Sequence, residues 1–221
     1  MAGKRRFRKR MGKPRRTAKK GSKVNVNKAL APFAQRYITK MKYAETIFIN
    51  AAGPQAYRWS LNSLYDPNFS GIGHQPHGFD TLATIYNRYR VINASYNITG
   101  VDQSGQYIVV CALPANEQVN ALTVSEMREN PRAKFITQAP NAHLKTLKGN
   151  VYLPSLVGRN KSQYMADDRY QAVSTTSPNE TALLNVYVQR LDQGSNTLNV
   201  PIQITIEYTV EWFDVKNLSQ S

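Results

Sequence analysis

The residues with the clearest chemical potential are the lysines and arginines at the start of the chain. Residues 1–23 read MAGKRRFRKRMGKPRRTAKKGSK and hold twelve Lys or Arg side chains and no acid. Arginine donates bidentate hydrogen bonds to phosphate, lysine adds a point charge, and neither needs a fixed backbone when the ligand is a flexible polyanion. Because each neutralised phosphate releases counterions, the segment predicts salt-sensitive, largely sequence-independent nucleic-acid binding. The predicted contact residues are Lys4, Arg5, Arg6, Arg8, Lys9, Arg10, Lys13, Arg15, Arg16, Lys19, Lys20 and Lys23.

The same segment allows other interpretations. Lys13-Pro-Arg-Arg16 followed by Lys19-Lys20 also matches a nuclear import signal, and both roles can coexist. A charge run can simply be a solvated surface, but this one is unusually dense, terminal and free of acids. An anionic membrane surface is a weaker alternative, because the segment has no amphipathic apolar face.

The charge of the chain is concentrated in this arm. The formal net charge is +15, and with twelve of the 29 basic residues in residues 1–23, the remainder holds 17 basic against 14 acidic residues. The arm has too few apolar residues to offset the entropy of ordering it, so we expect it to be disordered on its own. The body is nearly balanced and lacks, in its sequence, a basic stripe interleaved with aromatic residues.

Other candidate chemistry is weaker. His74 and His77, with Asp80 nearby, could ligate a metal, but the surrounding glycines and proline favour a turn. The adjacent Asp167 and Asp168 are better explained as a surface pair than as a catalytic dyad. We therefore expect no enzyme activity, no metal and no cofactor.

Two further patterns have structural explanations. Gly71-Ile-Gly73 lacks the third glycine and the βαβ context of a dinucleotide-binding loop. Cys111, the sole cysteine, lies in an apolar run, which predicts a buried and inert thiol. No apolar stretch approaches the length of a membrane span, so no membrane insertion is expected.

Strand patterns dominate the rest of the chain. From Pro201 to Asp214 the residues Ile202, Ile204, Ile206, Tyr208, Val210 and Trp212 alternate with polar ones, which predicts a long strand with one wet face. Residues 106–113 are apolar on both faces and predict a central strand. Further strands are expected over residues 45–50, 57–61, 88–99 (with Ile92, Ala94, Tyr96 and Ile98 on one face), 134–139, 144–153 and 184–189.

Two short helices are expected between the strands. Phe79, Leu82, Ala83 and Tyr86 have helical spacing, with Asp80 placed to cap. Thr123-Val-Ser-Glu126 has the spacing of a capping box. About eight strands without a βαβ rhythm predict an all-β sandwich or jelly roll. We expect residues 1–40 to form the arm and a transition, and residues 41–221 the folded domain.

One stretch resembles a known family. LNSLYDPNFSGIGHQPHGFD, over Leu61–Asp80, and its continuation LATIYNRYRV, over Leu82–Val91, are similar to capsid proteins of circular, Rep-encoding single-stranded DNA viruses, the circovirus-like group. The resemblance implies an eight-stranded jelly roll of two facing antiparallel sheets. It also implies a T=1 icosahedral shell of sixty self-assembling copies, with the arm inside on a single-stranded DNA genome.

The partners expected on this basis are the viral genome, other copies of the chain, a host nuclear import receptor and a cell-surface receptor. The expected locations are the virion and, during assembly, the host nucleus. The alternatives are the coat protein of a small RNA virus, a cellular RNA-binding or ribosomal protein with a basic extension, and an enzyme on a β-sandwich. A ribosomal protein would be expected to have a basic body as well. Tyr65, Phe69 and Tyr164 are candidate interface anchors or end covers of the core, and Arg88 and Arg90 either touch nucleic acid or pair with carboxylates.

Overall fold

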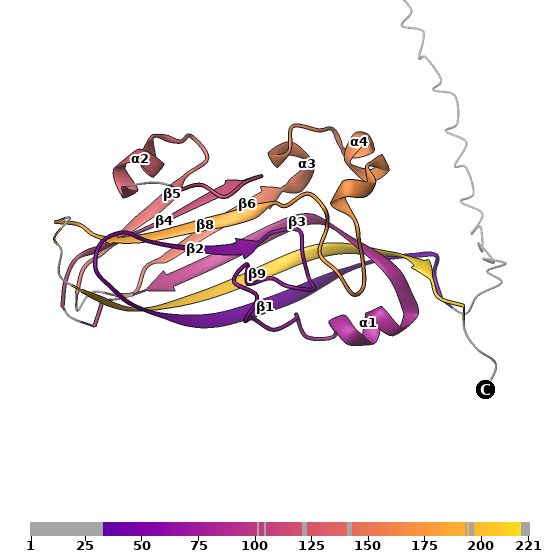
Figure 1. The fold of residues 1–221 in the computed structure, drawn as a ribbon, viewed down its shortest axis with the longest axis horizontal. Helices are drawn as coiled ribbons and strands as arrows, with labels where there is room; N and C mark the ends of the chain where they lie inside the picture. The colour runs from indigo at the N-terminus through magenta and orange to yellow at the C-terminus, as the bar shows by residue number, and fades with distance from the viewer. Residues whose placement is uncertain are drawn as a thin grey trace, which may run out of the picture. The chain divides into compact units, whose positions relative to one another are not determined.

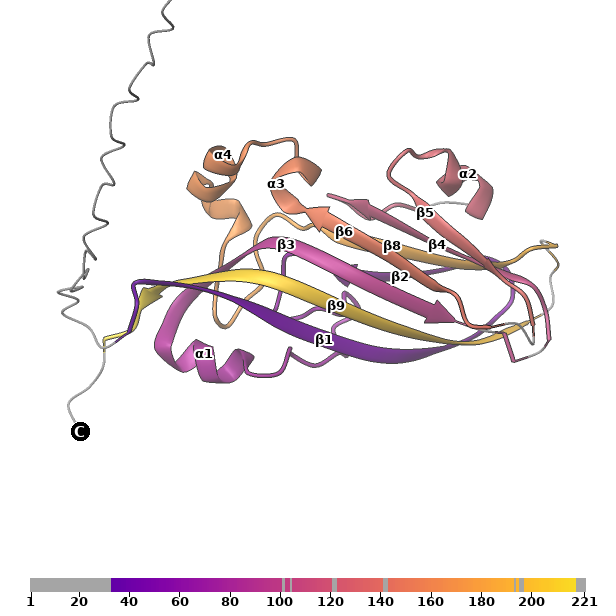
Figure 2. The ribbon, with the colours of Figure 1, turned by 180° about the vertical axis from the view of Figure 1, so that it is seen from behind.

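The computed structural model describes residues 33–217, apart from 101, 104, 121–122, 141–142, 193 and 195–196. Its strands form two antiparallel sheets that face each other, as Figures 1 and 2 show from opposite sides. Within these residues no helix has the length and apolar character needed to cross a bilayer. The expected disorder of the arm concerns residues that lie outside this description.

The larger sheet, sheet A, is organised about its longest strand. Its strand order is β1-β9-β3-β6, and β7 also pairs with β3. β9 pairs with β1 on one side, from Arg36 opposite Phe213 to Ala51 opposite Leu198, and with β3 on the other. The strands of sheet A are β1 (Arg36–Ala51), β3 (Tyr86–Gly100), β6 (Thr146–Tyr152), β7 (Ala172–Val173) and β9 (Leu198–Val215).

The smaller sheet, sheet B, has the strand order β2-β8-β4-β5. β4 is almost fully buried on both faces, as its continuous apolar run predicts for a central strand. β8 is also buried on both faces, although its sequence alternates apolar residues with Asn185 and Gln189. The strands of sheet B are β2 (Gln55–Ser60), β4 (Ile108–Ala115), β5 (Lys134–Gln138) and β8 (Leu183–Arg190).

The strand order identifies the fold. Both sheets pair strands that are distant in sequence: β1 lies beside β9, and β2 beside β8, while β4 and β5 are paired neighbours along the chain. The chain therefore crosses repeatedly between the sheets, and the long returns produce the two nested Greek keys of a jelly roll. This confirms the predicted class, an all-β jelly roll of two facing antiparallel sheets with short helices in its loops.

The core lies between the sheets, and β9 supplies its largest continuous apolar face. The six alternating residues from Ile202 to Trp212 are each at most 1% exposed. Burying a side chain of this size contributes about 1.5–3 kcal/mol. A second, smaller cluster lies on the far side of sheet B, where Cys111 and Leu113 pack with Val124 and Met127 of α2 (Val124–Glu129).

Both predicted helices are present, and one cap differs from the expectation. Thr123 caps α2 with both hydrogen bonds of the capping box. The capping role predicted for Asp80 is wrong: α1 (Phe79–Ile85) begins after Gly78, whose φ of 82° makes the turn. Asp80 lies instead in the first turn, where a carboxylate favours the helix dipole.

Three short helical segments between β6 and β7 were not predicted from the sequence. They are α3 (Leu153–Leu156), α4 (Lys161–Ala166) and the 3-10 turn η1 (Asp168–Tyr170). The capping box of Asn160 with Gln163 was the available signal for α4. Each segment is too short for helical periodicity to be visible.

Two strand predictions need correction. Ile92 does not share the inner face of β3 with Ala94, because a bulge between Val91 and Asn93 shifts the register and Val91 takes the buried position. β1 begins at Arg36, within the stretch expected to be a transition up to Lys40. β9 continues beyond Trp212, and Phe213 pairs with Arg36 of β1. This pairing between distant segments extends β1 beyond residues 45–50, the range that its own sequence pattern predicted.

The two faces of β9 predict opposite mutational effects. Replacing Ile204, which is 1% exposed, with Ala should lower the free energy of unfolding by about 2–5 kcal/mol, because it leaves a cavity in the core. Replacing its exposed neighbour Gln203 with Ala should change it by less than about 0.5 kcal/mol. Urea denaturation followed by tryptophan fluorescence measures the free energy of unfolding of both variants. An equal decrease in the two variants would contradict the assigned register.

Candidate nucleic-acid and assembly surfaces

The twelve basic residues predicted to contact nucleic acid, from Lys4 to Lys23, all lie outside the described residues. The described chain begins at Phe33 and enters sheet A at Arg36. Arg36 is opposite Phe213, two residues before the end of the described chain's last strand at Val215. The start of β1 and the end of β9 therefore lie at the same end of sheet A (Figure 1).

This end of the sheet carries a buried charge arrangement. Arg36 Nη1 lies 3.1 Å from Glu211 Oε1, and Arg90 is the partner of Glu211 on β3. Glu211 and Arg90 are each 4% exposed, so the outer face of β9, predicted to be wet throughout, is dry here. Arg90 donates to the carbonyl of Met165 at 2.6 Å and to Gln171 Oε1 at 3.0 Å. Burial lowers the pKa of Arg90, and these acceptors compensate for its lost hydration.

The two arginines singled out in the sequence differ in their surroundings. Arg90 is buried and engaged by the loop, so it is not available to a large polyanion. Arg88 is exposed, and its Nε lies 3.7 Å from Asp214 Oδ2. The expectation of carboxylate pairing therefore holds for Arg88, whereas Arg90 binds a carbonyl and an amide.

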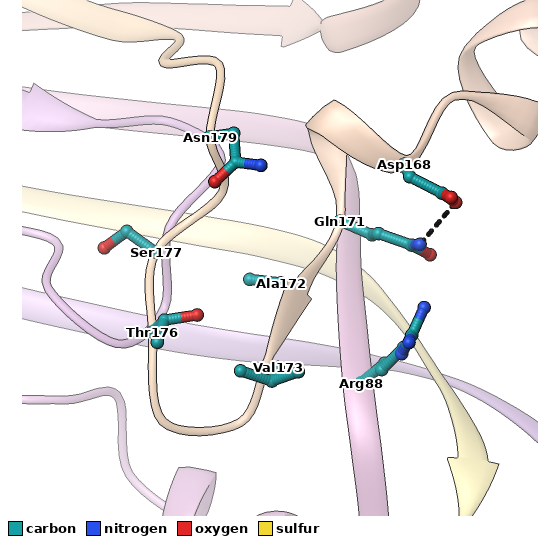
Figure 3. Close-up of a pocket in the computed structure, with 8 residues that line it drawn as sticks. All are labelled: Arg88, Asp168, Gln171, Ala172, Val173, Thr176, Ser177 and Asn179. Carbon is teal, nitrogen blue, oxygen red and sulfur yellow. Dashed lines mark hydrogen bonds between the residues drawn. The ribbon is translucent and has the colours of Figure 1, made fainter.

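A polar hollow of about 310 Å³ lies beside Arg88 (Figure 3). Arg88 borders it from β3, and Thr176 and Asn179 border it from the loop after β7. Gln171 Nε2 donates to Asp168 Oδ1 at 2.5 Å on the same rim. One cation beside a carboxylate gives no net preference for an anion, and we assign no ligand to this hollow.

Tyr89 fixes the segment that resembles a known family. Its buried hydroxyl accepts the backbone N–H of Leu64 at 3.3 Å and of Tyr65 at 3.4 Å. It donates to the carbonyl of Thr176 at 3.0 Å. One phenol on β3 thus joins the loop after β2 to the loop after β7, and burial raises its pKa.

Glu45 is the second anchor of the same loop. Its carboxylate accepts from Trp59 Nε1 and Tyr43 Oη, both at 2.8 Å, and from Asn68 Nδ2 at 2.8 Å. All three donors are neutral. Burial, and secondarily the nearby carboxylate of Glu45, raises the pKa of Asp66. The carboxylate holds residues 66–70 against β1.

The His74 loop has a packing role in the structure. The ring of His74 lies 4.7 Å from that of Tyr43, centroid to centroid. Among the described residues no group of three or more His, Cys, Asp or Glu side chains comes together in a way that could hold a metal ion. Cys111 is fully buried as predicted, and burial raises its pKa to about 11.

The candidate interface anchors divide into two groups. Tyr164 is fully buried, and its hydroxyl donates to the carbonyl of Val91 at 2.8 Å, so its role is internal. Tyr65 and Phe69 are 43% and 39% exposed. Of the three candidates, Tyr65 and Phe69 therefore present aromatic surface that another molecule could cover.

The Tyr89 hydroxyl generates a testable prediction. Replacing Tyr89 with Phe leaves two loop N–H groups and a carbonyl without their partner, which should cost about 1–3 kcal/mol of the free energy of unfolding. The matched control is Tyr96→Phe, because the buried Tyr96 hydroxyl makes no hydrogen bond to a described residue. Urea denaturation measures the free energy of unfolding of the two variants. An equal decrease in both would show that the Tyr89 hydroxyl does not hold the two loops in place.

Asp167 generates a pH prediction. Its carboxylate binds Arg169 at 2.9 Å and Arg159 at 3.2 Å, chiefly through hydrogen bonds from Arg169, and this lowers its pKa from 3.8 to about 2. Because the folded-state pKa is the lower one, the stabilisation is full above pH 3.8 and is lost as the pH falls through about 2. The protection factors of the amides of residues 159–171, which are corrected for intrinsic exchange, should fall as the pH drops through this interval. In Asp167→Asn the same amides should be less protected than in the wild type above pH 3.8, should match the wild type near pH 2, and should lose this step; retention of the step would contradict the assignment.

Comparison with known proteins complements the geometry. No model of a protein family matches the chain, and no curated protein matches it. Among solved structures, the chain is similar to the empty head of turnip yellow mosaic virus (10% identity, TM-score 0.48, covering 86% of this chain and 88% of that one). It is also similar to the semi-empty virus-like particle of Macrobrachium rosenbergii nodavirus (8%, 0.46, 86% and 100%) and to the decameric BFDV capsid protein (9%, 0.45, 80% and 99%). The jelly-roll assignment itself rests on the strand order and register described above.

Proposed function

We propose that this chain is a viral capsid subunit whose jelly-roll body assembles into a closed shell and whose basic arm binds the packaged nucleic acid. The observation that carries the proposal is the separation of charge from fold. Twelve cations without an acid precede a jelly roll whose own sequence is nearly balanced. A body of this kind serves as a container, and a segment of this kind serves as a tether for a polyanion.

The position of the arm supports this division of labour. The chain enters the body at Arg36, at the outer edge strand of sheet A, so the segment before it does not interrupt the core. The Arg36–Glu211 ion pair fixes the first residue of β1. Binding of the arm to nucleic acid therefore requires no rearrangement of the sandwich.

The finer proposal concerns genome and shell. The resemblance of Leu61–Val91 to circovirus-like capsids supports a circular single-stranded DNA genome, a T=1 shell of sixty copies and an arm that also directs nuclear import. In the structure this segment forms the loop after β2, α1 and the start of β3, and Tyr89 and Glu45 hold it in place. Tyr65 and Phe69, the half-exposed aromatics of this loop, are the proposed contacts between copies.

Assembly and packaging can be tested separately. The full chain should form particles of uniform diameter in negative-stain electron microscopy, with an absorbance ratio that reports co-purified nucleic acid. A variant with all twelve arm cations changed to Gln keeps the arm length and should retain particles with much less nucleic acid. Deletion of residues 1–23 should behave in the same way.

The outcomes discriminate between the alternatives. A full chain that stays monomeric at all concentrations and salt levels contradicts the capsid proposal. Nucleic acid that is digested by DNase and not by RNase, once released from particles, supports the single-stranded DNA genome, and the reverse supports an RNA-virus coat protein. Unchanged nucleic-acid content in the Gln-substituted arm would assign packaging to the body.

A further inference from the structure

The two edge strands on one side of the sandwich, β5 of sheet B and β6 of sheet A, lie next to each other (Figure 2). They do not form a ladder, and side chains connect them instead. Lys134 Nζ on β5 donates to the carbonyl of Lys148 on β6 at 3.2 Å, and Lys145 Nζ donates to the carbonyl of Thr137 at 3.1 Å. The two sheets therefore meet here at an edge linked by lysines.

This edge carries positive charge that no carboxylate neutralises. None of its five cations forms an ion pair with a residue in the described part of the chain. Three of them donate to main-chain carbonyls, and a fourth, Arg128, lies over the ring of Phe135 at 4.0 Å. A carbonyl satisfies a donor but leaves its charge, so the edge attracts anions. The five cations are Arg128, Arg132, Lys134, Lys145 and Lys148.

Several other cations of the body pair with carboxylates. Lys40 pairs with Glu207 at 2.7 Å, Arg169 with Asp167 at 2.9 Å, and Arg190 with Asp192 at 2.6 Å. The near balance of basic and acidic residues in the body thus hides a local excess along β5 and β6. Contrary to the expectation from the sequence, the body therefore has a basic stripe with aromatic residues, and this stripe forms only where the two edges meet.

A cleft of about 510 Å³ opens within this edge, and we call it the β5–β6 cleft. Arg132 and Lys134 line one side, and Asn150 and Tyr152 line the other. Tyr152 is 40% exposed, which leaves aromatic surface open to solvent. Asn150 Oδ1 accepts from Asn93 at 2.7 Å, and its amide nitrogen makes no hydrogen bond to a described residue.

Gly149 explains how the cleft is built. It lies opposite Tyr96 in the β3–β6 register, and a Cβ at this position would overlap the Tyr96 ring. The absent side chain lets Tyr96 extend across β6 and line the cleft. Tyr96 is 1% exposed, and its hydroxyl makes no hydrogen bond to a described residue. Because Tyr96 lines the cleft, its hydroxyl is free to form a hydrogen bond with a ligand there.

We propose that the β5–β6 cleft binds single-stranded nucleic acid, with a base against Tyr152 and the flanking phosphates on Arg132, Lys134 and Lys148. The Asn150 amide and the Tyr96 hydroxyl supply hydrogen bonds to the edge of the base. This combination of a cationic groove and an aromatic platform is the general means of binding unpaired strands. The proposal rests on the proposed packaging function and adds to it a contact made by the body.

Base-containing polyanions fit these observations better than sulfated polysaccharides. A polysaccharide would use the cations, but it has no base to stack on Tyr152 or to meet the amide of Asn150. A duplex keeps its bases stacked inside and offers mainly its backbone to such a cleft. The test therefore has to detect direct contact between a base and the side chains of the cleft.

The experiment uses the full chain and an oligothymidine carrying 5-bromodeoxyuridine. After irradiation, crosslinked peptides are mapped by mass spectrometry, and crosslinks are expected at Tyr152 or Tyr96 in addition to the arm. Arg132→Gln with Lys134→Gln, and separately Tyr152→Leu, should lower the crosslink yield in the remaining cleft peptides by about fivefold or more. The double variant should also reduce the slope of log K against log salt by about 1.4, as expected for two lost phosphate contacts on a single strand.

The matched control removes the same charge elsewhere. Lys40→Gln with Lys161→Gln changes one cation already paired with Glu207 and one exposed cation on α4, and it should leave both readouts unchanged. Crosslinks confined to the arm, or equal effects in the two double variants, would overturn the proposal. So would heparin bound at the cleft without any base crosslink, because it would identify a site for polyanions in general. Particle formation in the same preparations tests the capsid function separately, since a shell can form whether or not the cleft binds bases.

Discussion

The structure depends on the register of β9 between β1 and β3. The side chains of a strand alternate, so a slip of one residue would move the apolar row from Ile202 to Trp212 into solvent and put Glu207 and Glu211 into the core. The register also places Arg36 beside Glu211, and Arg90 opposite Glu211. The junction with the arm is therefore set by the same pairing that forms the core.

The long loops are attached to this core by a few buried acceptors. Tyr89 and Glu45 receive hydrogen bonds from the loop that follows β2, and Tyr89 also reaches the loop after β7. These donors are neutral, so the loops are held by hydrogen bonds and not by ion pairs that salt would screen. No second charged group has to lose its hydration to make these contacts. The proposed capsid function requires loops that keep their shape while they contact other copies, and this mode of attachment meets that requirement.

Charge is used in two ways in this chain. Lysines and arginines that meet a carboxylate, such as Arg169 with Asp167, tie the loops together locally. Those that meet only carbonyls, such as Lys134, keep an attractive field for anions. The cations of the β5–β6 cleft belong to the second kind.

The sequence by itself determined the arm, the alternating β9, the buried central strand β4 and the capping box at Thr123, because each is a local pattern. It did not reveal the bulge at Val91, the early start of β1 or the helices after β6, where pairing partners or very short segments decide the structure. The cleft was equally hidden. Arg132, Asn150 and Tyr96 are separated along the chain, and only the meeting of two sheet edges over Gly149 brings them to one place.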